Sequence, residues 1–400
     1  MKRIYMVTVI TCMAVLAVFI GSFRLLDITG RRDSLKVGFI YDNDESTAYT
    51  YNFSLAKDAV EKKYGDSVTI MTRSNVLDDE MEEPLRELAG AGCDIIFFNG
   101  YSEMVMELAP EYPDTEFCQT SYMDMSSVTV PPNYHTFKGE TYQCKYVSGI
   151  AAGMKIKEMI SEGIITADQA VVGFVAAFPT SEVISGYTAF LLGVRSVVPQ
   201  AVMKVCYTHT WSSYSHERDA AMSLIDDGCV IISQHTDTIG PAIACESVMQ
   251  DKTVYFVGYN QSMSEVAPGT SLVTARICWE SYVLAAVEAI MGNKSIEATI
   301  PGKIHGTGRT DVSAGFEEGW VEMTDLNLQV AAPGTQEAMD KAIERFKRGD
   351  RDFVFRGDYT GIDPDDPDDT IDLNKGYIEN ENTSYPLFHY ILKDVITVEI

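Results

Sequence analysis

The strongest constraint on the fold is an alternation of short buried strands and amphipathic helices, which is clearest around residues 171–211. Residues 171–176 (VVGFVA) form an apolar run of the length expected for a buried strand. Beyond Pro179, apolar residues recur every three or four positions through residues 182–197, which predicts a helix with one apolar face. Residues 202–207 repeat the strand pattern. Such a unit predicts a parallel sheet covered by helices, with ligands bound at the carboxyl ends of its strands.

The same alternation occurs on both sides of a long predicted helix over residues 141–160. Strands are expected at 36–41, 68–71, 93–98 and 115–120 before it, and at 171–176, 202–207, 230–234, 254–259 and 272–277 after it. Beyond residue 302 the pattern changes, and we expect a small antiparallel piece at 306–310 and 315–321 and a helix over 337–348. The chain is therefore predicted to be an α/β protein with two lobes, each a parallel sheet flanked by helices.

Charge and the N-terminus restrict the partners and the compartment. The formal net charge is −27, which argues against a nucleic-acid partner because phosphates require clusters of Lys and Arg. Lys2 and Arg3 precede an apolar run over residues 4–21, so residues 1–24 are predicted to be a signal peptide or a membrane anchor. Lipoprotein processing at Cys12, cleavage near Ser22 and an uncleaved anchor stay open. All three place the globular part outside the cytoplasm, tethered to the membrane or released.

Metal, cofactor and catalytic motifs are not found. Seven cysteines follow Cys12 without a CxxC pair, so buried free thiols are expected, and one disulfide stays possible in an exported chain. The acidic stretch 363–369 lacks the spacing of a calcium loop and is expected to be solvated. No nucleophile elbow, phosphate loop or HExxH motif occurs. We therefore expect no metal, no cofactor and no enzymatic activity.

A binding function fits the residues better, because aromatic and polar side chains recur together after the predicted strands. Flat rings stack on a planar heterocycle, and amide or carboxylate groups bond to its edge. The candidate ligand-binding residues are Tyr49, Tyr51, Asn52, Tyr101, Phe178, Trp211, His235, Asp237, Asn260 and Trp279.

Residues 176–190 (AAFPTSEVISGYTAF), followed by THTW at 208–211, are similar to a long motif of the basic membrane protein family, the substrate-binding proteins of ABC transporters. The resemblance covers about residues 36–355. It implies a two-lobed type I periplasmic-binding-protein fold that closes on a purine base or nucleoside and then docks on a membrane permease. It also implies that aromatic side chains clamp the base, one from the first loop and one at Trp211.

The resemblance also implies roles for other residues and shows departures from the family pattern. Residues 234–237 (QHTD) match the family closely, and Asp237 is the best candidate to bond ring nitrogens or an exocyclic amine. Tyr49 stands where the closest branch has tryptophan, Ser46 stands where other members have an acid that contacts ribose, and Asn260 replaces another acid. These departures leave the ligand open. Adenine or another purine base is the first choice, a nucleoside the second, and another heterocycle a third.

The expected organisation follows from the same resemblance. Lobe one is expected at 35–137 and 272–305, lobe two at 138–271 and 306–330, and residues 331–400 as a C-terminal extension packed on the lobes. The protein is expected to be a monomer whose partners are the ligand and an ABC permease. Two alternatives stay open, which are a membrane-tethered sensor that uses the same fold without transport and a nucleoside-processing enzyme.

Overall fold

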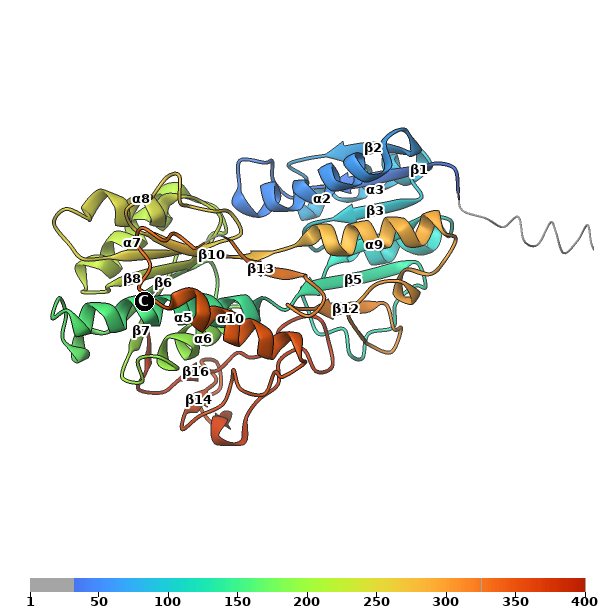
Figure 1. Ribbon diagram of the computed structural model, residues 1–400. Coiled ribbons are helices and arrows are strands. Elements are labelled where there is room, and N and C mark those ends of the chain that lie inside the picture. The colour runs from blue at the N-terminus through green and yellow to red at the C-terminus, as the bar shows by residue number, and fades with distance from the viewer. Residues whose placement is uncertain (1–31, 325, 400) are drawn as a thin grey trace, which may run out of the picture.

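The computed structural model describes residues 32–324 and 326–399, which form two lobes side by side (Figure 1). The first lobe contains a seven-stranded sheet in the order β11-β12-β5-β4-β3-β1-β2. Its strands are β1 (Leu35–Ile40), β2 (Val68–Arg73), β3 (Ile95–Phe98), β4 (Glu116–Thr120), β5 (Tyr134–Gly139), β11 (Lys303–His305) and β12 (Asp311–Ala314). Only β11 pairs antiparallel in this sheet. Helices α2 (Ala48–Tyr64) and α9 (Trp279–Met291) cover one face, and α3 (Glu82–Gly90) and α4 (Glu103–Leu108) cover the other.

The second lobe repeats this architecture with a seven-stranded sheet in the order β13-β10-β9-β8-β6-β7-β17. Its strands are β6 (Val171–Ala176), β7 (Val202–Tyr207), β8 (Ile231–His235), β9 (Tyr255–Tyr259), β10 (Ser271–Ile277), β13 (Val321–Met323) and β17 (Ile396–Glu399). Helices α5 (Thr141–Ser161) and α6 (Ser181–Arg195) cover one face, and α7 (Tyr214–Asp226) and α8 (Gly240–Val248) cover the other. The predicted α/β class, with two mainly parallel sheets flanked by helices, is confirmed.

Three segments connect the lobes, and the lobe boundaries that they define differ from the expected ones. The crossings lie between β5 and α5, between β10 and α9, and between β12 and β13. Strand β10 pairs with β9 and so belongs to the second sheet, whereas β12 pairs parallel with β5 and belongs to the first. Residues 272–277 therefore belong to the second lobe and residues 311–314 to the first, the reverse of the expected division. The cause is strand pairing across the hinge, which no local sequence pattern specifies.

Two other expectations differ from the structure. Helix α2 begins at Ala48 rather than near Phe53, because the Thr47 side chain caps it by accepting a hydrogen bond from the Thr50 N–H (3.3 Å). The polar loop is therefore shorter and Tyr49 lies in the first helical turn. Residues 306–310, expected to be a strand, form the turn between β11 and β12, and most of the segment 315–321 is the third crossing rather than a strand.

The C-terminal extension packs on the rest of the molecule. Helix α10 (Thr335–Lys347) lies along α5, and its Phe346 joins the core of the second lobe. Strands β14 (Thr360–Ile362), β15 (Thr370–Asp372) and β16 (Ile391–Leu392) form a small third sheet, drawn below the second lobe in Figure 1. The chain then returns as β17, which pairs parallel with β7 at the edge of the second sheet.

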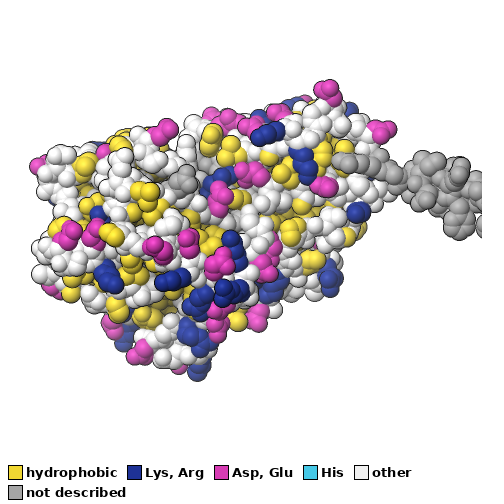
Figure 2. All heavy atoms as spheres, in the orientation of Figure 1, with side chains coloured by type: hydrophobic (Ala, Val, Ile, Leu, Met, Phe, Trp, Pro, Cys, Tyr) yellow, Lys and Arg dark blue, Asp and Glu magenta, His cyan; other side chains and the backbone are white. Residues whose placement is uncertain are grey.

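Figure 2 shows acidic, basic and apolar side chains interspersed over the face drawn. The seven described cysteines are free thiols, and five of them are buried. No helix within residues 32–324 and 326–399 combines the length and apolarity needed to cross a bilayer. The predicted signal or anchor segment, 1–24, lies outside the described residues.

We expect Gly149→Ala to reduce the free energy of unfolding by about 3 kcal/mol, because the core cannot accommodate an extra methyl group there. Gly149 of α5 and Gly193 of α6 face each other, and a Cβ at Gly149 would lie 2.1 Å from the Phe190 carbonyl oxygen. Urea denaturation measures the loss. The control is Gly90→Ala at the exposed end of α3, where a Cβ meets nothing within 4 Å. Equal stability of the two variants would contradict the close packing of α5 on α6.

Candidate binding site

A cavity of about 70 Å³ lies between the lobes, at the carboxyl ends of the strands of both sheets. Its lining residues are Asp42, Tyr49, Asn99, Gly100, Thr120, Tyr122, Lys138, Glu182, Trp211, His235, Asp237 and Tyr259. The first seven come from the first lobe and the other five from the second. The site is therefore complete only when the lobes meet.

The two lobes contact each other around this cavity. The Lys138 amine at the end of β5 lies 2.8 Å from a Glu182 carboxylate oxygen on α6, and both side chains are buried. The Ala48 N–H of the first lobe donates to the Asp237 carbonyl of the second (3.0 Å). These contacts show that the structure is closed. A buried ion pair needs its partner, because one charge left alone in the interior is strongly destabilising.

The first lobe supplies a polar wall that the protein itself holds in place. The Asp42 carboxylate accepts hydrogen bonds from the Asn99 amide (2.9 Å) and the Thr50 hydroxyl (3.1 Å). The Tyr49 hydroxyl donates to the Asn99 carbonyl (2.6 Å), and the Thr120 hydroxyl donates to the same oxygen (3.1 Å). Burial and the nearby Asp42 carboxylate raise the pKa of Tyr49 well above its usual value, so its ring is neutral.

The second lobe supplies aromatic rings and an acid. The Trp211 ring lies 5.4 Å from Phe178 and 6.3 Å from His235, measured between centroids. Burial lowers the pKa of His235 well below its usual value, and Lys145 and Lys138 lower it further, so this imidazole is neutral. Burial and the nearby carboxylates of Asp42, Glu217 and Glu182 raise the pKa of Asp237 well above its usual value.

A fully buried lysine lies directly behind the cavity. The Lys145 amine donates to the Gln234 carbonyl (2.7 Å) and stands 3.9 Å from the ring centroid of Tyr259, which lines the cavity. Burial lowers the pKa of Lys145 to about 7, against a smaller opposing effect of Cys144 and Glu182. The cation–π contact and the carbonyl thus replace the carboxylate that a buried lysine usually requires.

Four of the ten predicted site residues line the cavity, namely Tyr49, Trp211, His235 and Asp237. The others lie elsewhere. Phe178 packs on Trp211, Tyr101 stacks on Tyr122 (6.0 Å), Tyr51 is 40% exposed, Asn52 and Asn260 contact each other (3.4 Å), and Trp279 is buried in the core with its ring 5.8 Å from Tyr49.

The sequence reasoning missed several lining residues. Asp42 lies just beyond β1 and Thr120 ends β4, so the rule that ligands bind at strand ends could have found them. Glu182 lies inside the family motif at residues 176–190, but the sequence pattern indicates only that it begins a helix. The Lys138–Glu182 pair has no sequence signal, since its members are 44 residues apart and belong to different lobes.

Comparison with known proteins identifies the family. Residues 35–347 match the family model of the PnrA-like ABC transporter substrate-binding proteins, known as Bmp. The chain belongs to this family. ABC substrate-binding proteins act outside the cytoplasm, where they take up a small molecule for a membrane permease, so the predicted family, the general function and the compartment agree.

Individual relatives differ in what their names say they bind. A purine-binding protein of Brucella abortus is 28% identical over 276 residues, which cover 68% of this chain and 73% of the relative. A putative ABC transporter glucose-binding protein of Haloferax volcanii is 29% identical over 238 residues, covering 59% of this chain and 55% of the relative.

The fold also resembles solved structures of solute-binding proteins. One from Aeropyrum pernix has a TM-score of 0.63 at 14% identity, covering 84% of this chain and 95% of that one. One from Conexibacter woesei has a TM-score of 0.58 at 19% identity, covering 79% of this chain and 97% of that one. At these identities the likeness shows the fold alone.

Replacing Lys145 with methionine should change how stability depends on pH. The pKa of the amine is about 7 in the folded chain and about 10.4 in the unfolded chain, so between these values the unfolded chain binds more protons. The folded form of the wild type should therefore gain stability relative to Lys145→Met as the pH rises, by at most about 1.4 kcal/mol per pH unit. Below about pH 7 the difference should be constant.

The measurement is the difference in unfolding free energy between wild type and Lys145→Met, taken from urea titrations at several pH values. Lys157→Met, on the exposed side of the same helix, controls for the removal of a positive charge. A wild-type advantage that falls as the pH rises would contradict the assignment.

Proposed function

We propose that this protein captures a purine base between its two lobes, adenine first and a nucleoside second, and presents it to a membrane permease. The observation that supports this most is the convergence of three groups on one cavity. Tyr49 comes from the first lobe, and Trp211 and the Asp237 carboxyl group come from the second. Aromatic rings stack on the faces of a base, and a carboxyl group bonds to its edge.

Asp237 is the group whose hydrogen bonds the protein leaves to a ligand. Within the described part of the chain, its carboxyl group has neither a hydrogen-bond donor nor a basic partner. Burial raises its pKa and so shifts the group toward the neutral acid, a form that both donates and accepts a hydrogen bond. Adenine presents an amine donor beside a ring-nitrogen acceptor, and this edge is complementary to a neutral carboxyl group.

Charge and size favour a free base over larger or anionic relatives of it. Asp42, Glu182 and Asp237 line the cavity, and its one lysine, Lys138, is already paired with Glu182. A phosphate group would meet carboxyl groups without a free cation, so nucleotides are disfavoured. The cavity is small, about 70 Å³, which suits one base better than a base with its sugar.

A sugar is the alternative outside the purines, because one relative is named a putative glucose-binding protein. Sugars also bind between an aromatic ring and polar groups, so the lining residues alone do not decide. The rings supplied from opposite lobes favour a planar ligand with two apolar faces.

We expect adenine or a related purine to raise the thermal unfolding midpoint of the purified protein by several degrees, since a ligand at one hundred times its Kd stabilises the native state by about 2.7 kcal/mol. The screen should contain nucleobases, nucleosides, AMP, glucose and amino acids. AMP and glucose are expected to give no shift. A shift with glucose and none with any purine would replace the purine proposal with a sugar-binding one.

Substitutions at the rings test the placement of the ligand. Trp211→Ala and Tyr49→Ala should each weaken purine binding about 5- to 150-fold in calorimetric titration, because stacking on one aromatic ring contributes about 1–3 kcal/mol per base. Tyr51→Ala is the matched control, since Tyr51 lies two residues from Tyr49 on the same helix but points to solvent. Equal loss in Tyr49→Ala and Tyr51→Ala would place the ligand elsewhere.

A further inference from the structure

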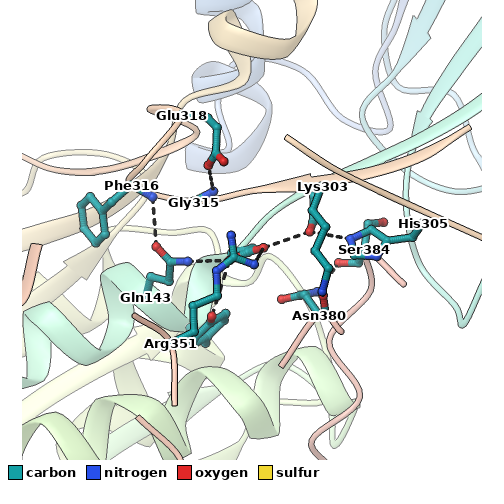
Figure 3. Close-up of polar contacts among 12 residues, drawn as sticks. Gln143, Lys303, His305, Gly315, Phe316, Glu318, Arg351, Asn380 and Ser384 are labelled. Atoms are coloured by element: carbon teal, nitrogen blue, oxygen red, sulfur yellow. Dashed lines mark hydrogen bonds and ion pairs between the residues drawn. The ribbon is translucent and has the colours of Figure 1, made fainter. Parts of the chain in front are cut away.

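The family match ends at residue 347, yet the chain after it returns to the space between the lobes. Residues 379–388, which we name the strap, contact both lobes. On the first lobe, the Asp311 carboxylate of β12 is 3% exposed and accepts hydrogen bonds from the Ser384 N–H (2.7 Å), the Ser384 hydroxyl and the Thr383 hydroxyl (3.2 Å). The Lys303 amine of β11 donates to the Asn380 carbonyl (3.0 Å), a contact drawn in Figure 3.

On the second lobe, the strap is fixed to helix α6. The Glu379 carboxylate is 1% exposed and accepts hydrogen bonds from the Ser185 hydroxyl (2.6 Å) and the Leu387 N–H (2.7 Å). The Ser181 hydroxyl donates to the Pro386 carbonyl (2.7 Å). Strap residues on both sides of Tyr385 are therefore bonded, 383 and 384 to the first lobe and 386 to the second.

Tyr385, between these two anchors, lies beside the binding cavity. Its ring stacks on Tyr122 with centroids 6.0 Å apart and planes 29° apart. The Lys138 amine stands 5.8 Å from the centroids of both rings. Tyr122 and Lys138 line the cavity, so a residue outside the family match supports two groups that face the ligand.

The extension also contacts the hinge itself. Glu140 follows β5 at the first crossing between the lobes, and its side chain has no exposed surface. Its carboxylate accepts hydrogen bonds from Gln143 of α5 and Ser313 of β12 (3.0 Å), and Arg351 of the extension pairs with it (2.9 Å). Figure 3 shows Arg351, Gln143, Lys303, Asn380 and Ser384 converging on this region from different segments.

We propose that the strap is a permanent third wall of the cleft, which restrains the two lobes near the closed arrangement before any ligand binds and positions Tyr122 and Lys138 through Tyr385. Opening the cleft would break either the hydrogen bonds of Thr383 and Ser384 to Asp311 or the hydrogen bond of Ser185 to Glu379, and so leave a buried carboxylate with fewer donors. The statement that Tyr122 and Lys138 face a purine rests on the proposed function. The restraint of the two lobes does not depend on it. A restrained protein binds its ligand more tightly, because a larger fraction of the ligand-free molecules is already in the conformation that binds.

The restraint is tested on the full-length protein without ligand. The double variant Thr383→Val with Ser384→Ala removes the hydroxyl donors to Asp311, and Ser185→Ala removes a donor to Glu379 from the other lobe. We expect each to raise the radius of gyration in small-angle X-ray scattering and to speed amide exchange at residues 139–143. Asn374→Ala is the control, because the Asn374 side chain donates to Asp358 in the exposed part of the extension, away from the strap and both of its anchors.

A radius of gyration and an exchange rate equal to those of the wild type in both anchor variants would overturn the restraint. Because the two variants cut opposite ends of the strap, failure of one of them to fold leaves the other to decide. No ligand is needed, so a failed purine screen and a failed restraint are separate results.

The positioning role of Tyr385 has its own readout in the same ligand-free protein. We expect Tyr385→Ala to speed amide exchange in the loop 121–125, which carries Tyr122, and Tyr385→Phe to restore the wild-type rate because the ring alone makes the stack. If adenine binds, Tyr385→Ala should lower its affinity about tenfold and Tyr385→Phe should not. Wild-type exchange in Tyr385→Ala would refute the positioning role.

Discussion

The buried ion pair between Lys138 and Glu182 is the contact on which the binding site depends. Each lobe supplies one charge, and within residues 32–324 and 326–399 neither charge has another ion-pair partner apart from His235, 3.9 Å from Glu182. The pair forms only when the lobes meet, and its 2.8 Å separation brings the end of β5 against the start of α6. The surrounding cavity is therefore a product of closure. Both charges lose their hydration in the closed form. The pair therefore favours closure only if each lobe holds its side chain in the position that allows the ion pair to form.

The fold followed from the sequence where a strand has a clear apolar pattern. Strand β6 is almost wholly buried and occupies the predicted residues, because an apolar run of six residues bounded by turn signals has few other stable environments. Strand β7 also occupies its predicted residues, with Met203 and Val205 buried on one face. The prediction failed where pairing is decided at a distance. Strands β10 and β12 lie next to the hinge, and which sheet each one joins depends on partners that are far away in the sequence or reached by a crossing. The start of α2 depended on one capping hydroxyl, that of Thr47.

The site was harder to predict than the fold, and the reason is visible in Tyr49 and Tyr51. Both tyrosines were candidates because they follow β1. A helix turns by about 100° per residue, so residues two positions apart point to different sides, and only Tyr49 reaches the cavity. Trp279 was chosen by the same logic, but the core beneath Tyr49 contains it. An aromatic residue near a strand end thus indicates the neighbourhood of the site, and the local backbone decides which ring contributes.

The buried carboxyl groups of this acidic chain differ in how many hydrogen bonds the protein gives them. Glu140 and Asp311 are buried, and each accepts several hydrogen bonds from the protein. Glu379 does the same, and Glu217 accepts from the Thr238 N–H and hydroxyl. These acids fix segments of the chain to one another, because buried polar groups are stable only when they are satisfied. Asp237 is the exception within the described residues, since its carboxyl group faces the cavity with no donor from the protein. This contrast with Glu140, Asp311, Glu217 and Glu379 supports the proposal that Asp237 bonds to the ligand.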